Sequence, residues 1–315
     1  MLFTILILIF TVIVVPFVAL NFGTDPTLLQ WEILNQMTYV VGGVIAYCFI
    51  VGELTKNNSQ VDKLWSIVPI WYVWQMTFLG FQGYKGGFDE RMILMAVLVT
   101  IWGIRLTYNF ARRGAYVLKF WEGEEDYRWE ELRKRPGFNN RFVWMLFNLF
   151  FISGYQNVLI FLFTLPILTA LNADSGPLNY IDWLLAVLFV ACVVIEYIAD
   201  QQQYDFQTEK HRRIKNGEPL GEYADGFVSK GLWSIVRHPN YAMEQTIWVV
   251  FYLFSVNATG EWINWSIPGC LLLIVLFKGS SDFSEEISAK KYPKYKEYQS
   301  KTPRFIPFGN KIRLF

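Results

Sequence analysis

The stretch IDWLLAVLFVACVVIEYIA at residues 181–199 decides the class of fold. It is almost continuously apolar, and about 20 predominantly apolar residues are what a helix needs to cross the hydrocarbon core of a bilayer. The whole chain is 53% hydrophobic and 18% aromatic, with charged residues held to 17%. Because this is richer in apolar side chains than a soluble domain normally tolerates, the sequence predicts an all-α integral membrane protein.

Similar stretches elsewhere predict a polytopic bundle of about seven to eight transmembrane helices. The predicted spans lie near residues 1–20, 36–52, 63–82, 91–110, 142–171, 181–199, 244–257 and 262–278. The first lacks a basic n-region and a small-residue cleavage site, so we expect it to be retained. The fifth is too long for one upright helix, and Gly154, Gln156, Asn157 and Pro166 inside it predict a kink or a tilt.

Basic residues are unevenly distributed between the connections. They gather in the loop 112–141, the loop 210–237 and the tail 290–313, whereas the segments 21–35, 172–180 and 258–261 carry no Lys or Arg. With eight spans the basic regions share one face with both termini, and the positive-inside rule places that face in the cytoplasm. We expect a multi-pass protein of the endoplasmic reticulum membrane in a eukaryote, or of the inner membrane in a bacterium.

Net charge and metal-ligand patterns exclude other classes. The net charge is only +1, which gives no indication of a nucleic-acid partner. Cys48, Cys192 and Cys270 lie in apolar spans without metal spacing and are interpreted as packing residues. His211 and His238 do not form a metal pair, so no metal site is predicted.

The densest polar pattern begins at the end of the sixth span. Glu196 and Asp200 are four residues apart and share one helix face, which Gln203 and Gln207 continue. Ionisable side chains at membrane depth are costly and mark a functional surface. The alternative is a helix end that simply emerges into water.

Two polar segments follow this helix, HRRIKNGEPLGEYADGF at 211–227 and GLWSIVRHPNY at 231–241. Arg and His can donate hydrogen bonds to phosphate, and Arg offers a planar fork of donors. A basic loop could also follow the positive-inside rule or contact anionic lipid. Charge alone does not account for the ordered mixture of Trp233, Arg237, His238, Asn240 and Tyr241.

This second segment resembles the cofactor motif of the steroid 5α-reductase-like and sterol-reductase membrane enzymes. Two other segments are similar to the same group, EYIADQQQYDFQ at 196–207 and the tail SSDFSEEISAKKYPKYKEYQSKTPRFIPF at 280–308. In the N-terminal half, VDKLW at 61–65 and WGIRL at 102–106 resemble one branch of the 5α-reductase family. The resemblance covers most of the chain, from about residue 40 to the end.

The resemblance implies that residues 142–315 bind NADPH and that residues 1–141 form the side that receives a steroid-like or other lipid substrate. The implied cofactor residues are Glu196, Asp200, Gln203, Gln207, Arg212, Arg213, Trp233, Arg237, His238, Asn240, Tyr241, Glu286, Tyr292 and Tyr298. Sterol reductases have Lys and Arg where this chain has Gln203 and Gln207. The phosphate charge must then be met by the loop, and preference for NADPH over NADH stays open.

Catalytic groups are expected on the N-terminal spans. Reducing an activated double bond requires hydride at the β-carbon and a donor to the oxygen where negative charge develops. The candidates are Asp62, Trp102, Arg105, Tyr108 and Gln156. Trp102 falls where steroid reductases have a tyrosine, with Tyr108 two turns further on, which puts steroid substrates in doubt. The alternative for these groups is a hydrogen bond between helices or a snorkelling side chain.

Two other functions fit parts of the pattern. Isoprenylcysteine carboxyl methyltransferases share an RHPxY turn and a Glu-Glu pair such as Glu285 and Glu286, and they use S-adenosylmethionine. That cofactor lacks a pyrophosphate and has little need for Arg212 and Arg213. A non-catalytic membrane scaffold with a reductase-like fold is the other alternative.

Overall fold

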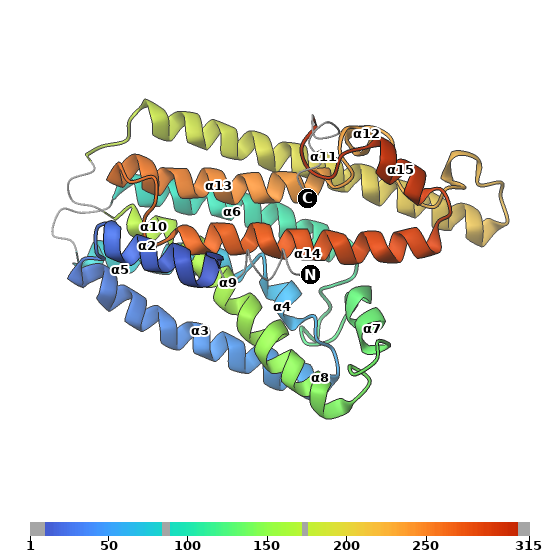
Figure 1. Ribbon diagram of the computed structural model, residues 1–315, viewed down its shortest axis with the longest axis horizontal. Helices are drawn as coiled ribbons and strands as arrows, with labels where there is room; N and C mark the ends of the chain where they lie inside the picture. Colours follow the sequence, from blue (N-terminus) through green and yellow to red (C-terminus); the bar gives the residue numbers. More distant parts are fainter. Residues whose placement is uncertain (1–9, 84–88, 172–175, 308–315) are drawn as a thin grey trace. The chain divides into compact units, whose positions relative to one another are not determined.

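The computed structural model describes residues 10–83, 89–171 and 176–307, and the regular structure of these residues is entirely helical (Figure 1). The chain separates into two compact units. The first comprises Met1–Val190 and Trp248–Leu273, and the second Ala191–Ile247 and Ile274–Phe315. The division predicted from the sequence assigns the substrate to residues 1–141 and NADPH to residues 142–315. That functional division stays a prediction.

The helices follow the chain in simple order. Those of the first unit are η1 Phe10–Val14, α2 Val15–Phe22, α3 Leu28–Thr55, α4 Gln60–Leu64, α5 Val68–Gly83, α6 Glu90–Ala111, α7 Tyr127–Arg133, α8 Arg141–Phe147, η2 Asn148–Tyr155, α9 Gln156–Thr164 and α10 Pro166–Thr169. Three helices continue from one unit into the other, α11 Tyr180–Asn216, α13 Pro239–Thr259 and α14 Ile267–Lys291. The second unit adds η3 Gly221–Tyr223, α12 Leu232–Ile235 and α15 Tyr295–Lys301.

Side-chain caps fix where several of the long helices begin. Thr27 and Gln30 form a capping box at the start of α3, each side chain accepting the other's backbone N–H. The carboxylate of Asp89 accepts two N–H groups at the start of α6, and the amide of Asn140 does so at α8. Each cap stabilises its helix by about 1 kcal/mol.

The predicted membrane-spanning fold class is confirmed. Among the described residues, five helical segments are long and apolar enough to cross a bilayer, namely Leu28–Thr55, Glu90–Ala111, Arg141–Thr169, Tyr180–Asn216 and Ile267–Lys291. The other predicted spans correspond to α2, α5 and α13, and residues 1–9 of the first lie outside the described residues. Helix α5 has 16 residues and is about 24 Å long, shorter than the hydrocarbon core of about 30 Å. The count of eight spans therefore stays a prediction.

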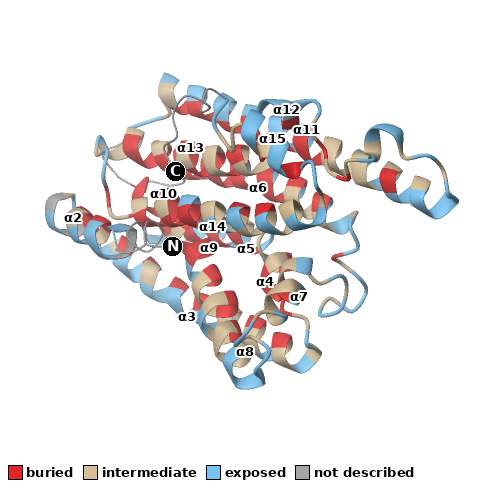
Figure 2. Cartoon of the chain, turned by 45° about the vertical axis from the view of Figure 1, so that its right-hand side comes forward, coloured by how far each residue is buried: buried red, intermediate tan, exposed pale blue. Residues whose placement is uncertain are grey.

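Exposure along the apolar helices indicates which faces meet lipid. Only 22% of the apolar stretch of α3 is buried, whereas 72% of the stretch in Arg141–Thr169 is buried. Figure 2 shows the same contrast between α3 and the largely buried α9 and α10. Long apolar helices with exposed faces need an apolar solvent. Contact with membrane lipids follows.

The predicted irregularity in the span at 142–171 is a π-helical segment. Between α8 and α9, η2 runs from Asn148 to Tyr155, and the N–H of Gln156 donates to the carbonyl of Phe151, five residues back. A second break comes at Leu165, where Pro166 begins α10 and cannot donate a backbone hydrogen bond. Helix α3 contacts both η2 and α9 (Figure 1).

Candidate functional site

The segment 231–241 is docked on α11 within the second unit. Gly231 has φ +61°, and a Cβ there would lie 2.6 Å from the side-chain amide of Gln202, so only glycine fits. The N–H of Leu232 donates to Gln202 Oε1 at 3.0 Å, and Trp233 Nε1 donates to the carbonyl of Ala199, also at 3.0 Å. Gln202 was not predicted as a site residue, although it lies in the DQQQ run.

Arg237 and His238 both bind one buried carboxylate. Arg237 donates to Glu285 through Nε at 2.7 Å and Nη2 at 3.2 Å, and His238 Nε2 lies 2.8 Å from Glu285 Oε1. Gln299 Nε2 and Arg304 Nη2 donate to the other carboxylate oxygen. Glu285 is 3% exposed, so it holds a buried charge cluster together.

Burial lowers the pKa of His238 below its ordinary value, although the carboxylate of Glu285 acts in the opposite direction. His238 is therefore neutral at pH 7 and lies ring to ring with Tyr241, with centroids 5.4 Å apart and planes 14° apart. The ring of Phe277 packs against that of Tyr241, with centroids 4.8 Å apart. The turn at residues 237–241 thus packs its aromatic rings beside the charged cluster.

The C-terminal tail runs alongside the turn and completes it. The N–H groups of Arg237 and His238 donate to the carbonyls of Pro303 and Arg304, at 2.8 and 3.1 Å. Arg237 Nη1 donates to the carbonyl of Thr302, and the hydroxyl of Tyr298 donates to the carbonyl of Trp233. Burial raises the pKa of Tyr298, so this hydroxyl stays protonated.

The polar face of α11 also reaches the turn. Asn240 Nδ2 donates to Asp200 Oδ1 at 3.2 Å, and both Asp200 and Glu196 are buried. Gln203 Oε1 is buried and accepts no hydrogen bond from the described part of the chain. A buried acceptor without a donor costs free energy, which a ligand N–H would recover. The backbone carbonyl of Gln207 lies 2.8 Å from His211 Nδ1.

The two arginines expected to meet phosphate are held by surface carboxylates. Arg212 pairs with Glu209 and Glu218, and Arg213 pairs with Glu209 and stacks over Tyr223. The side chain of Arg212 is 49% exposed. Exposed pairs of this kind stabilise by about 0–1 kcal/mol. They can therefore be exchanged for another anion at low cost, unlike the buried pair of Arg237.

The remaining tail residues divide between the site and the surface. The ring of Tyr292 lies against Gly226, where a Cβ would be 2.2 Å away, and Lys210 lies over the same ring. Glu286 is exposed and pairs with Lys290 at 2.7 Å. The structure thus brings Glu285, rather than Glu286, to the turn.

The predicted catalytic residues all belong to the first unit. Asp62 lies in α4, and Trp129 Nε1 donates to its carboxylate at 3.1 Å. Burial raises the pKa of Asp62, Asp126 raises it further, and Arg128 opposes the shift. The residue capping α4 is Ser59, so Asp62 is not the helix cap. A carboxyl group with a raised pKa is suited to donate a proton.

The other four candidates are separated along two helices. Trp102 is fully buried in α6 and meets Trp248 edge to face at 4.9 Å. Arg105 is buried one turn on, whereas Tyr108 is 53% exposed. Gln156 is buried at the start of α9. Trp102 thus packs in an aromatic core with Trp248. Tyr108 lies on another face of α6.

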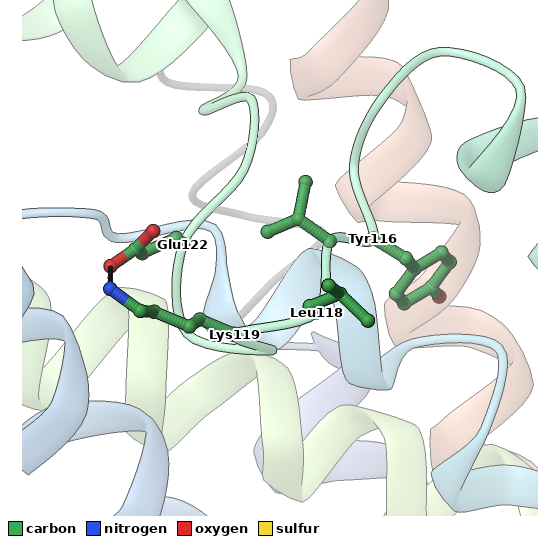
Figure 3. Close-up of a pocket in the computed structure, with 5 residues that line it drawn as sticks. Tyr116, Leu118, Lys119 and Glu122 are labelled. Carbon is green, nitrogen blue, oxygen red and sulfur yellow. Dashed lines mark hydrogen bonds and ion pairs between the residues drawn. The ribbon is translucent and has the colours of Figure 1, made fainter.

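The VDKLW motif anchors a loop of the first unit. Lys63 is 1% exposed, and its ammonium donates to the carbonyls of Phe120 and Glu122. Tyr116 donates to the carbonyl of Lys63 at 2.7 Å. This loop forms an open hollow of about 780 Å³, which is lined by Tyr116, Val117, Leu118, Lys119 and Glu122. Figure 3 draws the side chains that line it, with Lys119 and Glu122 joined by an ion pair. Lys63 was not predicted as a site residue, although it lies within the VDKLW motif.

Metal ligands do not gather in the parts of the chain that the structure describes. Residues 10–83, 89–171 and 176–307 contain no group of three or more His, Cys, Asp and Glu side chains arranged to hold a metal ion. Cys48, Cys192 and Cys270 are buried and unbridged.

Comparisons with known proteins point to one family. The family described as "Protein of unknown function (DUF1295)" matches residues 48–302. An uncharacterized protein of Schizosaccharomyces pombe is 36% identical over 288 residues, which cover 87% of this chain and 80% of the yeast protein. No solved structure matches the chain significantly. The match includes the turn, the α11 face and most of the tail, and the chain belongs to the DUF1295 family, which is of the steroid 5α-reductase-like type.

Proposed function

We propose that this protein is a membrane-embedded reductase that uses NADPH to reduce an activated carbon–carbon double bond in a lipid. The observation that carries the proposal is the hydrogen-bonded assembly of the segment 231–241, the polar face of α11 and the tail in one compact unit. Membership of a family of the steroid 5α-reductase-like type supports it. The resemblance described above implies NADPH at these same motifs.

The groups in the second unit fit this cofactor. The buried acceptor of Gln203 suits an amino or carboxamide N–H, and the ring pair of His238 and Tyr241 suits a flat heterocycle. Arg212 and Arg213 can leave their exposed carboxylates for phosphate, because exposed ion pairs contribute little and phosphate accepts the same charge-assisted hydrogen bonds. When bound, NADPH would supply the hydride. Arg237 would position the turn through Glu285.

Purified protein is expected to bind NADPH in the low micromolar range or tighter, and S-adenosylmethionine much more weakly. Calorimetry and fluorescence transfer from tryptophan would measure both. Arg212→Gln should weaken NADPH binding by about 1.5–3 kcal/mol. Lys301→Gln removes a similar exposed pair, that with Glu297, and should leave binding unchanged. A preference for S-adenosylmethionine would refute the reductase proposal, and binding of neither would favour the scaffold.

The methyltransferase remains the second candidate for a specific reason. Arg212 and Arg213 are already held by Glu209 and Glu218, and the buried Glu285 of α14 binds Arg237 of the turn. S-adenosylmethionine lacks a pyrophosphate and would leave those surface pairs intact. The calorimetric comparison separates the two candidates directly.

Replacing Asp62 with Asn is expected to lower turnover about a hundredfold, the lower end of what a positioned acid contributes, and to change NADPH affinity little. The pKa of Asp62 is raised, so its protonated form is present below that pKa and is lost as the pH rises through it. The turnover of the wild-type protein should therefore fall as the pH rises through the pKa of Asp62. Assays following NADPH oxidation with a panel of enone lipids would measure both effects. Wild-type activity in the variant would leave Asp62 with a structural role, since Asn can still accept from Trp129.

A further inference from the structure

The loop at residues 116–121, which follows α6, exposes a cluster of apolar side chains. Leu118 is fully exposed, and Val117 and Trp121 are each about half-exposed. Single exposed apolar residues are common on protein surfaces, whereas apolar residues that gather in one short segment mark a surface of contact. The open hollow described above lies beside Leu118, so the described part of the chain leaves this cluster uncovered.

Hydrogen bonds prevent these side chains from turning inward. Gln60 Nε2 donates to the carbonyl of Trp121 at 2.9 Å, and Lys63 Nζ donates to the carbonyl of Phe120 at 3.0 Å. Both donors belong to α4 and are buried. At the other end of the loop, the hydroxyl of Tyr116 donates to the carbonyl of Lys63 at 2.7 Å. Because the backbone is fixed at both ends of the loop, its exposed side chains are a permanent feature of the fold.

The loop is held at the end of an apolar helix that is long enough to cross a bilayer. This helix, α6, ends at Ala111. Ser66 Oγ lies 2.7 Å from Thr107 Oγ1 and 3.4 Å from the hydroxyl of Tyr116. Thr107 lies four residues before the end of α6, which is about 6 Å along the helix axis. The side chain of Tyr116 therefore reaches back to the last turns of α6.

A separate feature marks the membrane surface at the same end of α6. Tyr108 is exposed in the last turn of the helix, and the guanidinium of Arg112 lies over its ring, 5.5 Å from the centroid. Exposed tyrosines of membrane helices gather at the boundary between hydrocarbon and water, and arginines at helix ends extend toward the head groups. One turn earlier, Ile104 is exposed, as an apolar side chain in contact with acyl chains would be.

We infer that the loop at residues 116–121 is inserted into the surface layer of the lipid bilayer, where lipid covers Leu118 and fills the hollow beside it. Trp121 suits this layer, because tryptophan combines an apolar ring with a polar N–H. The ion pair of Lys119 with Glu122 is exposed, so Lys119 can turn to a lipid phosphate at little cost. Lipid is favoured over a protein partner, because the exposed side of α6 meets lipid next to the loop. The inference holds whether or not the protein is a reductase.

Depth-dependent quenching would test the inference on the full chain in phosphatidylcholine nanodiscs. A fluorophore would be attached to Leu118→Cys, since the three native cysteines are buried. Ile104→Cys is the control within the membrane. Ile214→Cys is the exposed control in water, because it lies about 22 Å along α11 beyond the apolar stretch 181–199. Phosphatidylcholine with a nitroxide near its head group should lower the Leu118→Cys emission by about twofold or more and leave that of Ile214→Cys nearly unchanged.

Hydroxyl-radical footprinting of the wild-type chain repeats the test without a label or a substitution. Leucine and isoleucine side chains react similarly, so Leu118 in nanodiscs should be modified at least fivefold more slowly than Ile214. Equal modification of the two residues, or quenching of Leu118→Cys no stronger than that of Ile214→Cys, would overturn the inference. Protection of Leu118 without quenching by the lipid nitroxide would mean that a protein, such as a second copy of this chain, covers the loop, and would overturn the lipid assignment.

Discussion

Replacing Glu285 with Ala is expected to destabilise the second unit by about 3–5 kcal/mol, the cost of leaving a buried charge without its partner. Arg237 and His238 would lose the carboxylate that holds them, and Gln299 and Arg304 would lose the bonds that join the tail to it. Equilibrium unfolding in detergent would measure the loss. Hydrogen exchange of residues 299–305 would show whether the tail detaches.

The adjacent residue supplies the control for this prediction. Glu286 is exposed and pairs at the surface with Lys290, so Glu286→Ala should cost about 0–1 kcal/mol. Equal effects of the two substitutions on unfolding would contradict the assignment of Glu285 as the centre of the cluster. If Glu285 does hold the turn, Glu285→Ala should also weaken the proposed NADPH binding, because the turn would be misplaced.

Asp182→Ala is the second substitution with a large expected effect, again about 3–5 kcal/mol, and it acts on the first unit. Arg91 binds Asp182 through two bonds, Nε to Oδ1 at 2.8 Å and Nη2 to Oδ2 at 3.0 Å, and their side chains are 1% and 0% exposed. Asn257 Nδ2 and the N–H of Asn179 donate to the same carboxylate. Removing the carboxylate of Asp182 leaves the guanidinium of Arg91 buried without its charge partner.

A double variant that removes both charges would test this prediction. Replacing both Arg91 with Met and Asp182 with Leu removes the charges together, and hydrophobic replacements of buried pairs are often neutral or stabilising. We therefore expect the double variant to unfold at a higher denaturant concentration than Asp182→Ala. A double variant as unstable as the single one would contradict the role assigned to the pair.

The fold class could be predicted because lipid imposes a simple rule on sequence. Runs such as 181–199 have few alternatives to a membrane helix, and the helices α3, α6, α11 and α14 confirm this. The π-helical segment η2 could be predicted only as an irregularity. That this irregularity is a π-helix goes together with the hydrogen bond from Ser153 Oγ to Asn148 Oδ1, which the spacing of the apolar residues does not reveal.

The candidate site shows a similar limit. The motifs pointed to segments that do lie together, since the turn, the α11 face and the tail meet in one unit, whereas their role as a cofactor site stays a prediction. Adjacent residues such as Glu285 and Glu286 lie about 100° apart around a helix, so a motif alone does not show which one faces inward. The spacing of four between Phe277, Ser281 and Glu285 was a usable signal for the inner face.

The tail residues that bind Arg237 and His238 are synthesised well after the turn itself. Until residues 302–304 leave the ribosome, the backbone N–H groups of the turn lack the carbonyls they bind in the folded protein. The helices around the turn can enter the membrane before then, whereas the turn itself has to wait. Completion of the candidate site therefore follows synthesis of the helices around it, and a ribosome that stalls shortly before Thr302 would leave a membrane-inserted protein without a completed site.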